Sequence, residues 1–134
     1  MSNTIIAQLQ AIINYQPLKI IEEVDVEYIR VAGTGELTEN QMMMVTVGGK
    51  EVLLANVNGS YYAIANKCSH LGGSLVKGTL GGGIVTCPRH GAQFDVKTGQ
   101  AVESAKIGFI KMGVKAVASY PVKVEGTDIY VGIA

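Results

Sequence analysis

The sequence predicts an all-β domain over most of its length. From Tyr28 onward, runs of β-branched and aromatic residues alternate with turn-forming dipeptides, which is the pattern of hairpin-connected strands. Gly48-Gly49 and Asn58-Gly59 mark the clearest turns, because two-residue hairpin turns need residues that tolerate positive φ. A total of 17 glycines in 134 residues suits a fold with many tight turns.

Residues 1–25 are predicted to form a helical extension, and the β domain is expected to occupy residues 26–134. Apolar residues with helical spacing run through residues 4–15, and the segment ends before Pro17. We expect this helix to pack on its own domain; docking to a second subunit, which would make the protein an oligomer, is the alternative. The apolar stripe consists of Ile5, Ile6, Leu9, Ile12 and Ile13.

The strands of the β domain follow in chain order. Each is a short apolar or alternating run that ends at a turn signal. The first two should pair as a hairpin around Gly48-Gly49, and the last two should pair around Gly126. Strands are expected at residues 45–47, 51–57, 61–64, 84–86, 118–124 and 128–133.

Both cysteines and both histidines fall in two short motifs, Cys68-Ser69-His70 and Cys87-Pro88-Arg89-His90. This set of thiolates and imidazoles predicts a metal site. Common zinc fingers place the cysteines in one pair and the histidines in another, whereas each motif here mixes the two types. A Rieske 2Fe–2S centre, with one iron on two Cys and the other on two His, fits the mixed motifs better. A zinc site, or a metal-free β interaction module, is left open.

The sequence resembles the Rieske iron–sulfur family. The resemblance rests on Cys68-Ser-His-Leu-Gly-Gly and Cys87-Pro-Arg-His-Gly-Ala-Gln-Phe-Asp, and it extends from about Tyr28 to Val131. It implies an antiparallel β-sandwich with a small cluster-binding subdomain, whose two loops lie at about residues 66–95. It also implies one 2Fe–2S cluster per chain, with Cys68, His70, Cys87 and His90 as its ligands.

Residues beside the four ligands should shape the cluster environment. We expect Leu71 to shield the cluster from water and Phe94 to pack beneath the second loop. Arg89 is expected either to favour the reduced cluster or to meet an acidic partner; a solvated loop residue is the alternative. The remaining neighbours should allow close backbone approach, stiffen the loop or line the cluster: Gly72, Gly73, Gly91, Pro88 and Ala92.

Four positions separate this chain from the Rieske subunits of cytochrome bc complexes. Those subunits carry an extra cysteine in each loop, where this chain has Gly73 and Arg89, so no loop disulfide is expected. They also carry a serine and a tyrosine that donate hydrogen bonds to sulfur, where this chain has Ala92 and Phe94. The resemblance is therefore to the low-potential ferredoxins of the family.

The resemblance implies a one-electron carrier and not an enzyme. Such ferredoxins pass electrons from a reductase to an oxygenase or another redox enzyme; an electron-transfer subunit of a larger oxidoreductase complex is the alternative. No histidine remains for a mononuclear iron site or for a hydrolytic base.

Composition excludes several other classes of function. The formal net charge is zero, and we find no nucleic-acid motif. No apolar run reaches the roughly 18 residues that suggest a membrane span. Because no export signal is recognisable and no cysteine is spare for a disulfide, the cytoplasm is the expected compartment.

Residues 103–114 depart from the family pattern. Relatives usually have a short Gly-Pro segment there, which covers the cluster, whereas this chain has no proline and extra residues. Its apolar residues could form a cap over the cluster, a docking lip for a partner, or ordinary core. They are Ile107, Phe109, Ile110 and Met112.

We predict a reduction potential in the lower part of the Rieske range of about −150 to +300 mV. Ala92 and Phe94 cannot donate hydrogen bonds to sulfur, so more negative charge stays on sulfur and the reduced cluster forms less readily. Protein-film voltammetry at neutral pH measures this directly. A potential above about +150 mV, in the upper half of that range, would contradict the hydrogen-bond argument.

Overall fold

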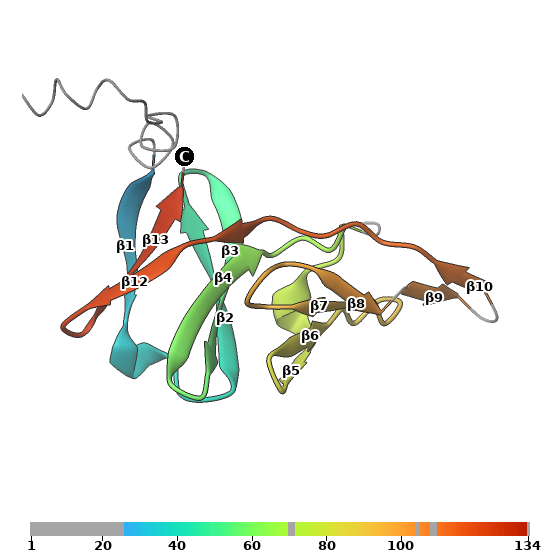
Figure 1. Cartoon of the computed structure of the whole chain (residues 1–134), viewed down its shortest axis with the longest axis horizontal. Helices are drawn as coiled ribbons and strands as arrows, with labels where there is room; N and C mark the ends of the chain where they lie inside the picture. The colour runs from blue at the N-terminus through green and yellow to red at the C-terminus, as the bar shows by residue number, and fades with distance from the viewer. Residues whose placement is uncertain (1–25, 70–71, 104, 108–109, 134) are drawn as a thin grey trace, which may run out of the picture.

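The computed structural model describes residues 26–69, 72–103, 105–107 and 110–133 (Figure 1). Its regular elements are antiparallel β-strands and two 3-10 turns, η2 (Thr34–Glu36) and η3 (Leu75–Lys77). The predicted all-β class is confirmed for this part of the chain. The helix predicted at residues 4–15 lies outside the described residues and stays a prediction. Within the described residues, no helix has the length and apolar character needed to cross a membrane.

Two sheets form the larger part of the domain. One has the order β11-β4-β3-β2, from β2 (Gln41–Val47), β3 (Lys50–Val57), β4 (Ser60–Ala65) and β11 (Ser119–Tyr120). The other has the order β1-β13-β12, from β1 (Glu27–Gly33), β12 (Val122–Glu125) and β13 (Asp128–Ile133). Buried side chains of both sheets pack into one core, as in a sandwich; they include Val47, Val52, Leu54, Ile129 and Val131.

A third sheet, of order β5-β6-β7-β8, belongs to the subdomain with the two cysteine-containing loops: the first loop leads from β4 to η3, and the second connects β6 to β7. The sheet consists of β5 (Thr79–Gly81), β6 (Ile84–Thr86), β7 (Gln93–Asp95) and β8 (Ala101–Glu103). Its core includes Val85 and Phe94, and it also takes Leu53 and Ile64 from β3 and β4. Successive residues of β3 thus enter different cores, because side chains alternate between the faces of a strand. The central sheet is therefore the platform that holds the loop-bearing subdomain.

The β3–β4 turn has the conformation that its sequence predicts. Asn58 and Gly59 have φ values of 55° and 91°, as a two-residue primed turn requires. The buried Asn56 side chain supports the turn: its Oδ1 accepts from the Gly59 N–H at 2.8 Å, and its Nδ2 donates to the Leu37 carbonyl at 2.9 Å. The predicted hairpin is confirmed here.

The single strand predicted at residues 118–124 is wrong. The chain changes sheets at Pro121: β11 pairs with β4, whereas β12 pairs with β13. Pro121 has no N–H for a ladder, so a strand is readily interrupted there. Its carbonyl accepts from the Gly132 N–H at 2.9 Å, and a Cβ at Gly132 would lie 2.9 Å from the Pro121 ring.

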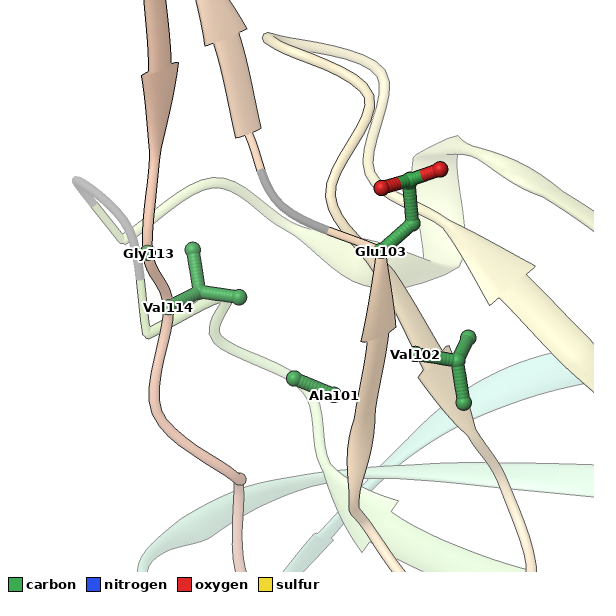
Figure 2. A pocket seen from close by; sticks show the side chains of 5 residues that line it. All are labelled: Ala101, Val102, Glu103, Gly113 and Val114. Atoms are coloured by element: carbon green, nitrogen blue, oxygen red, sulfur yellow. The ribbon is translucent and has the colours of Figure 1, made fainter.

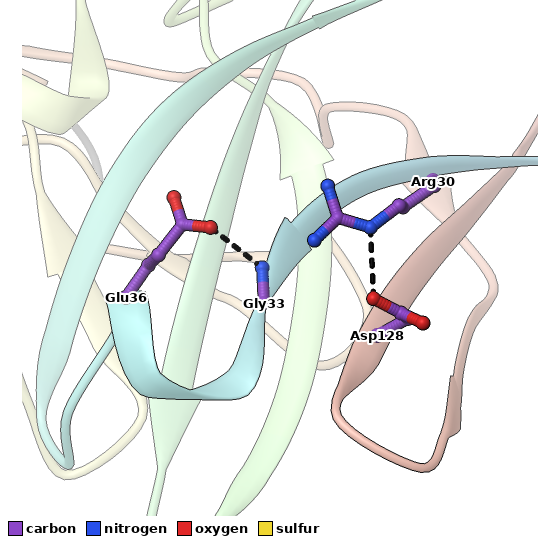
Figure 3. Close-up of polar contacts among 4 residues, drawn as sticks. All are labelled: Arg30, Gly33, Glu36 and Asp128. Carbon is purple, nitrogen blue, oxygen red and sulfur yellow. Dashed lines mark hydrogen bonds and ion pairs between the residues drawn. The ribbon is translucent and has the colours of Figure 1, made fainter.

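Two polar contacts fasten the end of the β1–β13 pair (Figure 3). Arg30 Nε donates to Asp128 at 2.8 Å, and the Gly33 N–H donates to the Glu36 carboxylate at 2.8 Å. The hydrogen bond to Asp128 raises the pKa of Arg30. Because both side chains of this ion pair are about half exposed, it contributes little to stability.

A separate two-stranded ribbon, β9 (Ala105–Ile107) and β10 (Ile110–Met112), follows β8. It projects away from the three sheets beyond the loop-bearing subdomain (Figure 1). Among the described strands, β9 and β10 pair only with each other. From β10 the chain returns along residues 113–118 to β11, and Gly99 fastens this return segment, since its carbonyl accepts from the Val117 N–H at 2.9 Å.

Replacing Gly99 with alanine should destabilise the fold more than the same change at Gly49. Both glycines have φ of +80°, so both substitutions carry a backbone penalty of about 1–2 kcal/mol. A Cβ at Gly99 would also collide with the Val117 carbonyl, whereas Gly49 faces open space. We expect at least about 2 kcal/mol of additional loss at Gly99, within the usual range for severe core mutations. Equal losses in chemical denaturation would contradict this packing.

Candidate metal centre

Two loops from different strands meet at one end of the loop-bearing subdomain. The first loop follows β4 and contains Cys68; the second connects β6 to β7 and contains Cys87. Both cysteines are buried, and they belong to the same core cluster as Ala92 and Phe94. The sequence prediction that the two motifs lie together is therefore consistent with the positions of their cysteines.

The two loops close with the same backbone hydrogen bonds. The Cys68 N–H donates to the Gly73 carbonyl at 2.7 Å, and the Gly72 N–H donates back to the Cys68 carbonyl at 3.1 Å. In the second loop, the Cys87 N–H donates to the Ala92 carbonyl at 2.8 Å, and the Gly91 N–H donates to the Cys87 carbonyl at 3.2 Å. In each loop the first bond runs from the cysteine to the residue five positions later, so the two loops close with the same pair of backbone bonds.

Glycine is needed at the fourth position after each cysteine. Gly72 has φ of +70° and Gly91 has φ of +79°, a region that residues with a Cβ enter at a cost. The histidine lies at a different distance from this glycine in each motif. His90 directly precedes Gly91, whereas His70 precedes Gly72 by two residues. The two motifs, Cys-x-His and Cys-x-x-His, thus stand in loops that close with matching backbone bonds.

The loops also touch each other. A Cβ placed on Gly73 would lie 3.1 Å from Sγ of Cys87 and 2.7 Å from Cδ of Arg89. Gly73 of the first loop therefore forms one wall around the sulfur of the second. A side chain at position 73 would collide with Cys87 and Arg89, so glycine is what allows the two loops to lie this close together.

The histidines and the remaining predicted neighbours take different positions. The His90 side chain is half-buried, and its Nδ1 atom is shielded from solvent. Pro88 and Arg89 are exposed, whereas Phe94 is fully buried beneath the loops. His70 and Leu71 lie outside the described residues, so their predicted roles stay predictions.

Within the described ranges, no group of three or more His, Cys, Asp or Glu side chains lies close enough to hold a single metal ion. A Rieske cluster needs no such group, because each iron takes only two protein ligands and the inorganic sulfides bridge the two irons.

Asn66 supports the first loop, and sequence reasoning missed it. Its side chain is buried, donating from Nδ2 to Ser74 Oγ at 2.9 Å and accepting from the Val76 N–H at 2.9 Å. Its carbonyl also accepts from the Leu75 N–H at 2.8 Å. Asn66 therefore joins both ends of the loop that contains Cys68. The sequence offered no signal, because an asparagine before a loop is usually a solvated turn residue.

Ser69, next to Cys68, makes a second contact that the sequence did not reveal. Its hydroxyl donates to the Lys115 carbonyl at 2.6 Å. The first loop is thereby tied to the segment that returns from the β9–β10 ribbon.

The family profile described as the Rieske 2Fe–2S domain matches residues 27–121. The chain belongs to the Rieske 2Fe–2S domain family. The ferredoxin component of the alkene monooxygenase system of Xanthobacter autotrophicus is 34% identical to this Rieske protein over 112 residues, which are 83% of this chain and 85% of that protein. Human apoptosis-inducing factor 3 is 38% identical over 96 residues, but these are 72% of this chain and only 15% of that protein.

Solved structures agree with this assignment. The ferredoxin of carbazole 1,9a-dioxygenase from Nocardioides aromaticivorans IC177 has a TM-score of 0.69 to this Rieske domain at 34% identity, covering 78% of this chain and 95% of that chain. A chain in the complex of reduced oxygenase and oxidized ferredoxin in carbazole 1,9a-dioxygenase has a TM-score of 0.64 at 26% identity, covering 78% and 91%.

The predicted cofactor and class of function are confirmed. The cofactor of this protein is a Rieske 2Fe–2S cluster, and the protein is an electron carrier of the ferredoxin type. The paired loops, each with a buried free cysteine, fit such a group.

Replacing Asn66 with alanine should impair cluster retention, whereas replacing Asn56 should not. Each asparagine is buried and makes two side-chain hydrogen bonds. Either substitution should therefore lower the free energy of unfolding by about 1–3 kcal/mol for each buried group left without its partner. Only Asn66 holds the first loop, so the Asn66→Ala protein should lose visible absorbance and iron well below its unfolding midpoint. Equal cluster loss in the two variants would contradict a specific role of Asn66.

Proposed function

We propose that this protein carries single electrons from a reductase to the terminal oxygenase of an oxygenase system. The observation that carries the proposal is the pair of identically closed loops with both cysteines buried between them. Support comes from the ferredoxin component of an alkene monooxygenase system and from the ferredoxin that forms a complex with its oxygenase.

In this proposal the four ligands are Cys68, His70, Cys87 and His90. They lie in two loops, at about residues 66–95, of a single domain that spans residues 26–134. The bound cluster would accept and release one electron at a time. The burial of both cysteines favours sulfur ligation on the protein side, since a buried thiolate must be neutralised by a metal or an ion pair. The half-buried His90 favours imidazole ligation toward the surface.

The other residues of the site keep water out and set the charge around it. Phe94, Ala92 and Leu75 fill the space beneath the loops with apolar atoms, so no protein hydroxyl from these positions reaches the sulfur side. Arg89 is exposed beside His90 and brings a positive charge to the rim. Gly73 lets the first loop pack closely against Cys87 and Arg89 of the second.

A subunit or domain of a larger redox assembly is the second candidate. The observation in its favour is the similarity to human apoptosis-inducing factor 3, because the matched region is only 15% of that longer protein. In either case, we propose the cytoplasm as the compartment, because both cysteines serve as ligands in this scheme and a reducing environment protects them. The N-terminal extension, residues 1–25, remains a candidate helix and oligomer contact.

The His90→Ala protein should lose the visible absorption of the cluster and fail to support oxygenase turnover. An imidazole is one of only two protein ligands on its iron, so its removal leaves that iron under-coordinated. The assay combines this protein with the reductase and oxygenase of an alkene monooxygenase or carbazole dioxygenase system from which the native ferredoxin is omitted, and product is measured.

Arg89→Ala is the matched control, because residue 89 lies in the same loop but is exposed. It should retain the spectrum and the iron content. An unaltered spectrum in His90→Ala would refute its assignment as a ligand. A normal spectrum without turnover in any tested system would instead refute delivery to an oxygenase.

A further inference from the structure

The return segment, residues 113–118, forms part of the cover over the core of the loop-bearing subdomain. Val114 and Val117 are half-buried, and they pack against the core cluster that contains both Cys68 and Cys87. If this segment moved away, water would reach the apolar surroundings of the two cysteines. The position of the segment therefore matters to the site, although the segment itself contributes no proposed ligand.

Backbone hydrogen bonds fasten the end of the return segment that leads into β11. The Val117 N–H donates to the Gly99 carbonyl at 2.9 Å, and the Ala118 carbonyl accepts from the Ala65 N–H at 2.9 Å. These two bonds connect the segment to the β7–β8 turn and to the end of β4. They fix residues 117 and 118, which lie at one end of the segment.

The other end of the return segment borders a cavity of about 230 Å³ (Figure 2). Gly113 and Val114 line one side of this cavity, and residues 101–103 of β8 line the other. Each water occupies about 30 Å³ in the liquid, so the space holds several waters. A Cβ at Gly113 would also meet no atom within 4 Å. Packing therefore does little to fix the segment at this end.

The sequence of the return segment does not stiffen it either. Residues 113–118 read Gly-Val-Lys-Ala-Val-Ala and contain no proline, the residue whose ring fixes φ. The glycine at the start has the largest backbone freedom of any residue. Since neither a proline nor close packing holds the start of the segment, its order depends on hydrogen bonds.

Ser69 supplies a hydrogen bond at the middle of the return segment. Its hydroxyl donates to the Lys115 carbonyl at 2.6 Å, one residue beyond the cavity-lining Val114. Ser69 itself lies between Cys68 and His70 in the first loop. One side chain thus belongs to the proposed ligand loop and also holds the segment that covers the core beside it.

We infer that Ser69 is a positioning residue for the cluster: its hydroxyl holds residues 113–118 in place and so keeps water away from the buried cysteines. The inference rests on the proposed ligand set. With two thiolates and two neutral imidazoles as ligands, reduction adds one negative charge to an uncharged centre. Water stabilises a charged form better than an apolar cover does. Loss of the Ser69 hydroxyl should therefore raise the reduction potential.

The test compares Ser69→Ala with Ser69→Thr in the holoprotein, because threonine keeps the hydroxyl. Cluster loss is followed as bleaching of the visible absorbance in the presence of an iron chelator. Ser69→Ala should lose the cluster at least about threefold faster than the unmodified protein, as the loss of one ordinary hydrogen bond allows. Its potential in protein-film voltammetry should shift upward. Ser69→Thr should match the unmodified protein in both measurements.

Thr38→Val is the matched control, because Thr38 Oγ1 also donates an exposed hydrogen bond of 2.6 Å, to Gln41 Oε1 outside the loop-bearing subdomain. It should change neither the rate of cluster loss nor the potential. Equal behaviour of Thr38→Val and Ser69→Ala would overturn the inference. Faster loss at an unchanged potential would also overturn it, because that result would assign Ser69 a role in stability alone. A Ser69→Thr protein that behaves like Ser69→Ala would contradict the role of the hydroxyl.

Thermal unfolding separates the local role from a global one. Because the Ser69 bond is exposed, Ser69→Ala should leave the unfolding midpoint close to that of Thr38→Val. A much lower midpoint in Ser69→Ala would overturn the inference, since the faster cluster loss would then follow from general destabilisation. Failure of the proposed ligand set is distinguishable, because it would appear in the unmodified protein as a cluster without histidine nitrogen coupling.

Discussion

The structure depends on one constraint: two separate loops must bring their cysteine side chains into one buried cluster. The backbone meets it by closing both loops alike, with each cysteine N–H bonded to the carbonyl five residues later. This closure turns Cys68 and Cys87 into the core and leaves His90 half-buried. Glycine at positions 72 and 91 lowers the conformational energy of this closure, because both positions have positive φ.

The remainder of the fold holds that arrangement rigid. Strand β3 sends alternate side chains into two cores, so the sandwich and the loop-bearing subdomain share one central sheet. Asn66 connects the end of that sheet to both ends of the first loop. A polar side chain buried in this way stabilises one geometry and penalises others, because any alternative leaves its hydrogen bonds unmade. The same loop is fastened to the return segment through Ser69.

Local features of the sequence predicted much of the fold and the site. The turn at Asn58-Gly59 was predictable because its φ preferences act within two residues. The change of sheets at Pro121 was not, because it depends on which distant strands each half pairs with. The role of Asn66 was hidden for the same reason: burial is a property of the assembled fold.

Function follows from these parts in order: paired loops, and a cluster held between them at one end of the domain. The central claim is that sulfur from the core side and nitrogen from the rim side hold the two irons. Because His70 and His90 are the only histidines, ¹⁵N-labelled histidine reports on these positions alone. Pulsed EPR of the reduced, labelled protein measures the claim most directly. Two strongly coupled histidine nitrogens are the result that this account predicts; a cluster signal without histidine nitrogen coupling would contradict it.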